Sequence, residues 1–383
     1  MHWGIILMQD IQSSIDLTLL TDVVRQAQRS QSFELLDWNV HILSERGTGD
    51  PEGLLRVSGI GRDEDGVRPW AVALKVIKRS LAGNIAPSHL GYWRRETNAY
   101  TSGLLANLPG PVMPACCYAI TEQPDSAWIW MELLTDVTGG AWDLSHYAFA
   151  ADQLGRFNGA CARTDPLPNA PWLARDHARV WNGMMSFDAA WQDPRVRQHL
   201  TPQMGERLLR LWNERERFFT ALERLPQGFS HFDFKRANLF LRNRDDGQLE
   251  VAAIDWGDCG IGALGGDLAL LVGGSCFFFD WDPLRVAELS EVAYTAYLTG
   301  LHASGWQGND DQVRLAYTAW MALYWGPPVT AAVAFFINDE NRPSVLRIFG
   351  RPPEELPVPM ASLCAFAMEC ADEARILMVH VLT

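Results

Sequence analysis

The chain has 383 residues, of which 48% are hydrophobic and 20% are charged. This composition supplies enough apolar side chains for buried cores and argues against wholesale disorder. Because one core rarely organises so long a chain, we expect two lobes with a ligand cleft between them. The formal net charge of −14 disfavours nucleic acid and anionic membranes as partners, since both attract basic surfaces. It is compatible with a cationic ligand, and equally with an acidic surface kept for solubility.

The seven cysteines are scattered and include no C-x-x-C pair, so they predict neither a zinc site nor a redox pair. We expect reduced cysteines and a cytoplasmic location. The apolar run from Trp3 to Met8 lacks a basic leader and is too short for the core of a signal peptide. No segment has the roughly 18 to 20 apolar residues that a membrane-spanning helix requires. We therefore expect no membrane partner.

The first third of the chain is predicted to be mainly β-structure. Apolar residues at helical spacing indicate a leading amphipathic helix within 11–32. A second helix is expected at 92–108, ending before Pro109 and Gly110. Runs rich in β-branched and aromatic residues, separated by Gly, Asp and Pro, indicate strands. The expected strands are 39–43, 54–60, 70–77, 117–120 and 127–133.

The remainder of the chain has helical character from Leu144 onward, except for strand-like runs at 239–242 and 249–254. The predicted fold class is therefore α+β, with a small β-rich lobe followed by a larger helical lobe. We place the boundary so that the N-terminal lobe is 1–133 and the C-terminal lobe is 134–383.

The strongest chemical signal lies in two segments, Ser230–Phe240 (SHFDFKRANLF) and Ala253–Gly257 (AIDWG). Phosphoryl transfer requires a protein mainly to position the reactants and to neutralise phosphate charge. Three residues meet these requirements in such a site. They are an Asp that accepts a hydroxyl proton, an Asn five positions later that reaches a metal, and a second Asp after the next strands.

These segments resemble the protein-kinase-like superfamily, and specifically its aminoglycoside phosphotransferase branch of small-molecule kinases. His231-x-Asp233-x-x-x-x-Asn238 is similar to the catalytic loop, and Ile254–Gly257 is similar to the metal-binding motif. The resemblance implies a protein-kinase-like bilobal fold with ATP and Mg²⁺ as cofactors. It also implies that Asp233 is the catalytic base and that Asn238 and Asp255 coordinate magnesium. We expect His231 to brace the loop through a hydrogen bond.

The same fold needs a lysine for the α- and β-phosphates and a helix glutamate that orients it. Lys75 lies on the third predicted strand, and Ala73 shares its face, where it can pack against adenine. Lys78 points to the other face if the strand is regular. Glu96 is the best glutamate on the following helix, and its alternative role is a surface ion pair with a neighbouring arginine.

Two further segments are expected at the nucleotide. Gly47 and Gly49 lie between the first two predicted strands, but Gly53 comes one position too late for G-x-G-x-x-G. We assign this loop to the nucleotide by its position and not by its motif. The resemblance also implies an adenine-binding backbone hinge from Glu132 to Leu134.

A Ser/Thr protein kinase is the first alternative, because such enzymes carry a lysine two residues after the catalytic Asp, where Lys235 stands. Against it, Gly266–Ala269 (GDLA) follows Asp255 closely, and no Ala-Pro-Glu motif appears. That element resembles the aminoglycoside phosphotransferase branch, which implies that Asp267 braces the catalytic loop. Asn158 stands where this branch often has His. A catalytically silent nucleotide-binding scaffold is the second alternative, although the base, the metal Asp and the lysine all have candidates.

The acceptor is expected to bind in the helical lobe beyond the metal motif. Sugars and cations both favour sites with aromatic and acidic side chains, although aromatic residues at helical spacing more often form core. We expect a hydroxyl acceptor such as an aminoglycoside, an amino sugar or a related sugar, cationic in character, and a chain that is a monomer or a homodimer. The candidate acceptor residues are Asp258, Asp280, Asp282, Trp281 and Tyr324.

Overall fold

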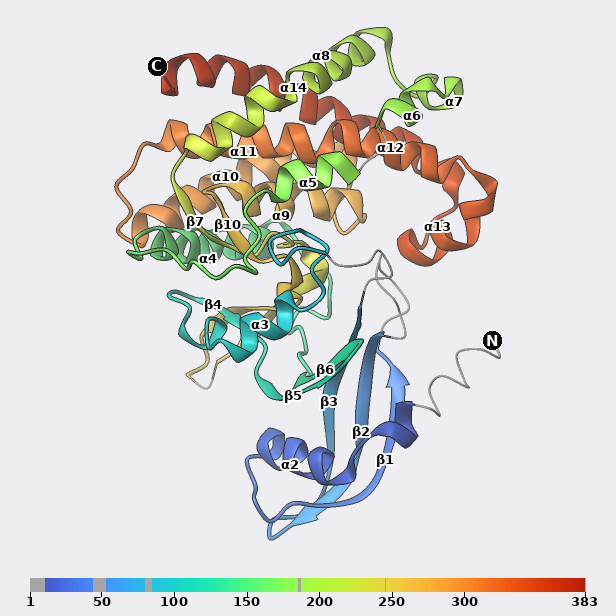
Figure 1. Ribbon diagram of the computed structural model, residues 1–383, viewed down its shortest axis with the longest axis vertical. Helices are drawn as coiled ribbons and strands as arrows, with labels where there is room; N and C mark the ends of the chain where they lie inside the picture. Colours follow the sequence, from blue (N-terminus) through green and yellow to red (C-terminus); the bar gives the residue numbers. More distant parts are fainter. Residues whose placement is uncertain (1–10, 44–52, 80–84, 185–186, 245, 383) are drawn as a thin grey trace.

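The computed structural model describes residues 11–43, 53–79, 85–184, 187–244 and 246–382. A sheet-based N-terminal lobe lies at one end of the molecule and a larger helical lobe at the other (Figure 1). The α+β class expected from the sequence is confirmed.

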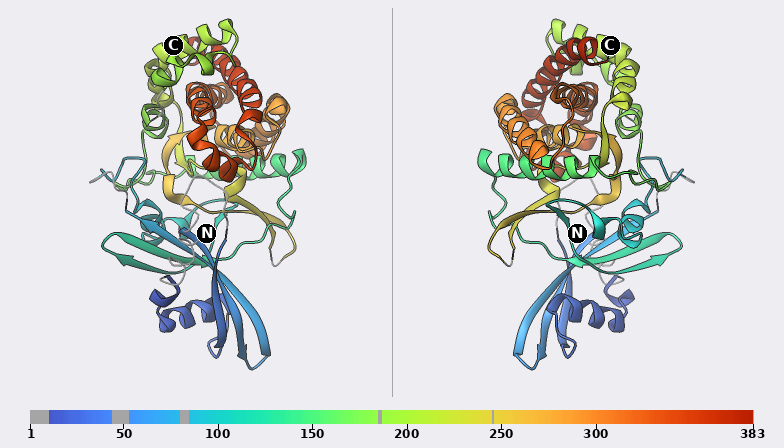
Figure 2. Two further views of the ribbon diagram at one scale, coloured as in Figure 1. Left: turned by 90° about the vertical axis from the view of Figure 1, so that its right-hand side faces the viewer. Right: turned by 90° about the vertical axis from the view of Figure 1, so that its left-hand side faces the viewer.

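The N-terminal lobe is built on an antiparallel five-stranded sheet with the strand order β1-β2-β3-β6-β5. Helix α2 (Leu17–Gln28) lies against one face of this sheet (Figure 2) and begins at Leu17 because the Asp16 carboxylate accepts two backbone N–H groups there. The strands are β1 (Glu34–Ile42), β2 (Leu54–Asp63), β3 (Gly66–Lys78), β5 (Cys117–Gln123) and β6 (Ser126–Glu132).

Strand β3 separates the two small cores of this lobe. Val72 and Leu74 pack into the core beneath α2, whereas Ala73 packs into a second core on the opposite face. Because side chains alternate along a strand, Lys75 shares the face of Ala73. Ile254, from the metal motif of the C-terminal lobe, packs on that second core, so this face of β3 is turned toward the cleft.

The second predicted helix is shorter than expected. Helix α3 covers Arg95–Thr101, and a separate 3₁₀ turn follows at Leu105–Asn107. Gly103, between them, has φ +75°, a left-handed conformation that ends an α-helix. The five predicted strands of this region are all present, although β1 and β3 begin four or five residues earlier than expected.

A three-stranded sheet with the order β4-β9-β8 connects the two halves of the chain. Strand β4 (Val112–Pro114) is parallel to β9 (Leu249–Ala253), which pairs antiparallel with β8 (Leu239–Asn243). A strand that precedes residue 133 therefore belongs to the same sheet as two strands near the catalytic loop. The division at 133/134 remains a proposal.

The C-terminal lobe is a bundle around buried helices, with a small two-stranded sheet of β7 (Gln227–Ser230) and β10 (Gly260–Ala263) at its base. Its helices are α4 (Leu144–Ala162), α5 (His177–Met184), α6 (Phe187–Gln192), α7 (Pro194–Arg197), α8 (Pro202–Arg224), α9 (Gly266–Phe277), α10 (Val286–Ala303), α11 (Asp310–Trp325), α12 (Pro327–Phe336), α13 (Arg342–Phe349) and α14 (Pro357–Val381).

Helices α4 and α10 pack with their backbones in close contact. A Cβ at Gly155 would lie 2.1 Å from the carbonyl oxygen of Tyr297, and one at Gly300 would lie 1.9 Å from that of Asp152. Only glycine permits this approach at either position.

No single helix in the described ranges is long and apolar enough to cross a membrane. The segments Asp310–Phe336 and Asp339–Phe349, bent by 87°, reach those limits only as a pair.

Candidate active site

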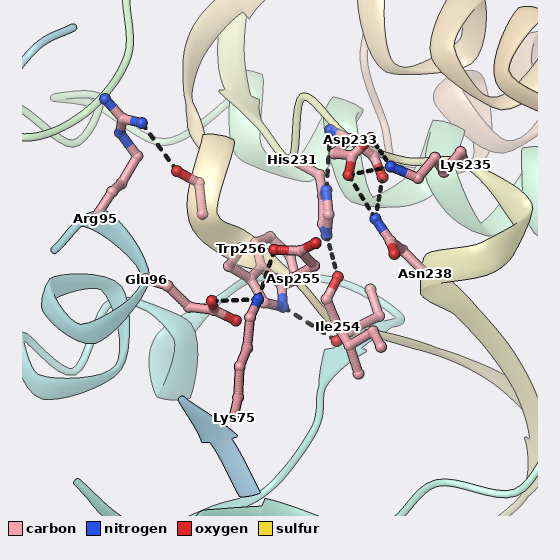
Figure 3. A network of polar contacts seen from close by, with 12 residues as sticks. Lys75, Arg95, Glu96, His231, Asp233, Lys235, Asn238, Ile254, Asp255 and Trp256 are labelled. Atoms are coloured by element: carbon pink, nitrogen blue, oxygen red, sulfur yellow. Dashed lines mark hydrogen bonds and ion pairs between the residues drawn. The ribbon is translucent and has the colours of Figure 1, made fainter. Parts of the chain in front are cut away.

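The predicted catalytic loop runs from β7 to β8 and folds around Asp233. The Asp233 carboxylate accepts hydrogen bonds from Lys235 Nζ at 2.8 and 2.6 Å and from Asn238 Nδ2 at 2.7 Å (Figure 3). Asn238 Nδ2 also donates to the backbone carbonyl of Asp233, at 2.9 Å. Because the amide nitrogen of Asn238 is committed to Asp233, the side-chain oxygen is the atom left to bind a metal.

Burial raises the pKa of Asp233 to about 6, with the Lys235 ammonium acting in the opposite direction. A carboxylate whose pKa lies near neutrality can take a proton from a hydroxyl more readily than an ordinary Asp. The Asp233 carboxylate is therefore a stronger base than an ordinary Asp.

His231 links the catalytic loop to the metal motif. Its Nδ1 accepts a hydrogen bond from the Asp233 N–H at 3.1 Å, so its Nε2 carries the proton and donates to the Ile254 carbonyl at 3.0 Å (Figure 3). Burial lowers the pKa of His231, which keeps the ring neutral and compatible with one donor and one acceptor. These are contacts of a bracing residue.

Asp267, in the first turn of α9, holds the start of the loop. Its buried carboxylate accepts from the backbone N–H groups of His231 at 3.0 Å and Phe232 at 2.8 Å. Phe232 has φ +60°, so the loop turns sharply just before Asp233. Asn158 Nδ2 approaches the same carboxylate at 3.4 Å and its oxygen accepts from the Tyr297 hydroxyl at 3.0 Å, so Asn158 is well accommodated.

Asp267→Asn is expected to destabilise the protein by about 2–4 kcal/mol, because the new amide group would point a donor at a buried backbone N–H. Urea unfolding measures this loss. Asp16 is a matched control, since it also accepts from two backbone N–H groups but is exposed. Asp16→Asn should change stability by no more than about 0.5 kcal/mol. Equal losses in both variants would contradict a bracing role for Asp267.

The metal motif follows β9, and Asp255 adopts a left-handed conformation with φ 65° and ψ 60°. Its Oδ1 lies 2.7 Å from Lys75 Nζ, which is also 2.6 Å from Glu96 Oε2 (Figure 3). Partial loss of solvent would raise the pKa of Asp255, but Lys75 and Lys235 hold that pKa well below its ordinary value. Asp255 is thus a carboxylate whose charged form is favoured by the lysine of β3.

Glu96 faces inward, so the alternative of a surface pair with a neighbouring arginine is wrong for this residue. Arg94 instead pairs with Glu122 at 3.3 Å. Burial raises the pKa of Glu96, and Lys75 opposes that shift. The structure therefore brings together the lysine, the glutamate and the metal-motif Asp that were predicted from three separate segments.

Arg95 fixes α3 to the metal motif, a role that sequence reasoning missed. The buried guanidinium donates to the carbonyl of Gly257 at 2.9 Å and to that of Trp172 at 2.7 Å. It also donates to the carbonyls of Pro87, His89 and Leu90. Because Glu96 is the next residue, these bonds set its position relative to Asp255.

Of the segments predicted to contact adenine and its phosphates, the structure describes only some. Gly47 and Gly49 lie outside the described residues. Ala73 is buried beside Met131 in the core that faces the cleft. The Glu132 carboxylate pairs with Arg242 at 2.8 Å, and the Glu132 N–H donates to the Cys116 carbonyl.

Of the five residues predicted to bind the acceptor, Tyr324 and Asp258 lie near Asp233. Burial raises the pKa of Tyr324, and the charges of Asp233 and Asp258 raise it further. The other three candidates lie in the turn after α9. Asp282 caps a 3₁₀ turn by accepting from Leu284 N–H, and the Trp281 indole donates to the Arg285 carbonyl. Asp280 precedes them.

The catalytic loop, the metal motif and the lysine–glutamate pair meet between two lobes in the arrangement of a protein-kinase-like phosphotransferase. Residues 99–307 match the model of the phosphotransferase enzyme family. The match spans more than half of the chain, and the chain belongs to this family. The predictions of the family and of a phosphotransferase are confirmed.

Comparison with solved structures supports the fold assignment. The microcompartment-associated aminopropanol kinase is similar with a TM-score of 0.54 and 12% identity, covering 94% of this chain and 98% of that one. This similarity confirms the protein-kinase-like bilobal fold. A choline kinase from Cryptosporidium parvum Iowa II matches with a TM-score of 0.48 and 9% identity, covering 95% and 97% of the two chains. An aminoglycoside phosphotransferase from Alicyclobacillus acidocaldarius matches with a TM-score of 0.43 and 16% identity, covering 89% and 93%. A search of curated proteins finds no match.

Proposed function

We propose that the chain transfers the γ-phosphoryl group of Mg-ATP to a hydroxyl of a small molecule that carries an amine, such as an aminoglycoside, an amino sugar or an amino alcohol. The observation that carries this proposal is the geometry around Asp233. Its carboxylate is held by Lys235 and Asn238, next to the Asp255–Lys75–Glu96 cluster.

The residues present fit magnesium. Asp255 offers a charged carboxylate, and Asn238 has one oxygen free of its bonds to Asp233. Within the described ranges, no group of three or more His, Cys, Asp or Glu residues could hold a metal alone. Magnesium commonly takes one or two protein ligands and fills its other positions with water and phosphate oxygens. When bound, it neutralises the charge of the phosphates.

Each charged residue has a distinct task in this proposal. Asp233 orients the acceptor hydroxyl and takes its proton on a carboxylate oxygen as the new oxygen–phosphorus bond forms, while the bond from the γ-phosphorus to its bridging oxygen breaks and ADP leaves. Lys235, bonded to Asp233, offers positive charge to the transferred group. Lys75 holds the other phosphates, and Glu96 fixes the direction of its ammonium group. The Leu134 N–H, which makes no backbone hydrogen bond in the described part of the chain, is the hinge donor that we assign to adenine.

Lys75→Met is expected to lower kcat/KM for ATP by a factor on the order of 10². The change removes the ammonium group that positions the phosphates. Lys78→Met is the matched control, because residues three apart on a regular strand face opposite sides. Steady-state kinetics at varied ATP concentration measures both variants. Similar losses in the two variants would show that Lys75 has no special role at the phosphates.

A substrate screen tests the function as a whole. The purified chain with Mg-ATP is offered aminoglycosides, amino sugars, neutral sugars, choline, 1-amino-2-propanol, hydroxy amino acids and peptides, and products are identified by mass spectrometry. Phosphorylation of an amine-bearing small alcohol is expected. Preferred phosphorylation of peptides would favour a protein kinase, although α9 begins at Gly266 and leaves no room for a long activation segment. Nucleotide binding without any product would favour a silent scaffold.

A further inference from the structure

His177, the first residue of α5, is a buried histidine that the proposed reaction does not yet use. Its side chain is 0% exposed, and neither ring nitrogen has a hydrogen-bond partner among the described residues. Helix α5 packs against α11 in the C-terminal lobe (Figure 1). Burial of an imidazole without hydrogen-bond partners destabilises the folded state, so such a residue calls for a functional explanation.

A stack of aromatic rings fixes the orientation of His177. One face of the imidazole lies on Phe232, with centroids 4.8 Å apart and planes at 26°. Tyr324 is stacked on His177 at 5.9 Å and 14°, and Trp181 is stacked on Tyr324 at 4.7 Å and 4°. Phe232 directly precedes Asp233, and its N–H is held by Asp267. The position of His177 is therefore fixed relative to the catalytic base.

The group that His177 faces is the carboxylate of Asp258. His177 Nε2 lies 3.7 Å from Asp258 Oδ2, and the Asp258 side chain is 36% exposed. In the described part of the chain, Asp258 makes no other ion pair or side-chain hydrogen bond. Asp258 thus lies beside a buried imidazole while about a third of its own side chain is exposed.

We propose that Asp258, oriented by His177, binds the protonated amine of the acceptor while Asp233 receives its hydroxyl. This inference rests on the proposed function and adds to it a residue that selects the substrate class. The charged carboxylate favours amino alcohols over amine-free alcohols, because a charge-assisted hydrogen bond in a partly dry cleft is stronger than one in water. His177 is a positioning residue, since it restricts rotation of the Asp258 carboxylate without touching the acceptor.

Matched pairs of ligands test the amine site without requiring turnover. The pairs are 1-amino-2-propanol with 1,2-propanediol, and glucosamine with glucose. Ligand-observed NMR measures their binding to the full chain loaded with Mg²⁺ and AMP-PNP. The unaltered protein should bind at least one amine about tenfold more tightly than its partner, and Asp258→Asn should remove most of that preference. Asp176→Asn removes the same charge from the exposed neighbour of His177 and should leave the preference unchanged.

The role of His177 is tested by His177→Phe, which keeps an aromatic ring in the stack but removes both nitrogens. This variant should weaken binding of the amine several-fold while thermal unfolding shows that the fold is retained. The double variant His177→Phe with Asp258→Asn should bind the amine no more weakly than Asp258→Asn alone, because the two residues act as a unit. Additive losses would overturn the positioning role.

Three results would overturn the amine site itself. The first is that the unaltered protein binds neither amine more tightly than its amine-free partner. The second is that Asp258→Asn keeps the full preference for the amine. The third is that Asp258→Asn loses binding of AMP-PNP and not of the amine. Failure of the proposed function is a separate result. It would appear as an Asp258-dependent preference for amines with no phosphorylated product in the substrate screen.

Discussion

Asp233→Asn is expected to lower kcat by a factor on the order of 10² to 10⁴ while the affinity for Mg-ATP stays within about twofold. An amide cannot take the proton of the acceptor hydroxyl. In the unaltered protein, the Asp233 carboxylate accepts hydrogen bonds from both Lys235 and Asn238. The substitution replaces this carboxylate, which can only accept, by an amide that also carries a donor group. A coupled assay with the best substrate of the screen measures kcat, and calorimetry with AMP-PNP measures nucleotide affinity.

The matched control for Asp233→Asn is Asp176→Asn, an exposed aspartate of the same lobe, which should leave kcat unchanged. Turnover near that of the unaltered protein in Asp233→Asn would remove this residue from the mechanism. Loss of nucleotide binding together with turnover would instead show that Asp233 serves the fold of the loop.

Asp255→Ala is expected to weaken magnesium-dependent ATP binding by a factor on the order of 10² or more and to abolish turnover. The variant removes the carboxylate proposed to bind the metal. It also releases Lys75, which then keeps Glu96 as its only ion-pair partner in the described ranges. Calorimetry with AMP-PNP, in the presence and absence of Mg²⁺, measures the effect.

AMP-PNP binding without Mg²⁺ provides the internal control. Under that condition, Asp255→Ala and the unaltered protein should bind AMP-PNP with similar affinity, whereas with Mg²⁺ the affinity of the variant should be much lower. An unchanged affinity in the presence of Mg²⁺ would contradict the assignment of Asp255 to the metal.

The sequence was most informative where function depends on local spacing. The sequence spacing between Asp233 and Asn238, together with the motif at Asp255, predicted the family and the fold. Both predictions are confirmed. Strand alternation placed Lys75 and Ala73 on one face of β3, where the structure has them. The metal and catalytic roles assigned to these residues remain predictions, as do the cytoplasmic location and the oligomeric state.

Features that depend on contacts between distant segments could not be predicted. From the sequence, Arg95 would be assigned to the surface. Its hydrogen-bond partners are backbone carbonyls, which any residue type can provide, so no sequence motif indicates them. His177 and Asp258 lie far apart in the chain and on different elements, so no spacing relates them. Strands β4, β7 and β10 are too short for alternation to be visible. The acceptor roles of Asp280, Trp281 and Asp282 remain predictions, and Gly47 and Gly49 lie outside the described residues.

The buried guanidinium of Arg95 has a consequence for regulation. Protein kinases are switched by moving the helix that carries the glutamate, which breaks its pair with the strand lysine. In this chain, the same movement would separate Arg95 from the carbonyls of Gly257 and Trp172. A buried charge that loses its partners destabilises a protein by about 3–5 kcal/mol. The contacts of Arg95 therefore hold in place the helix that carries Glu96, whereas the corresponding helix of a switched protein kinase moves.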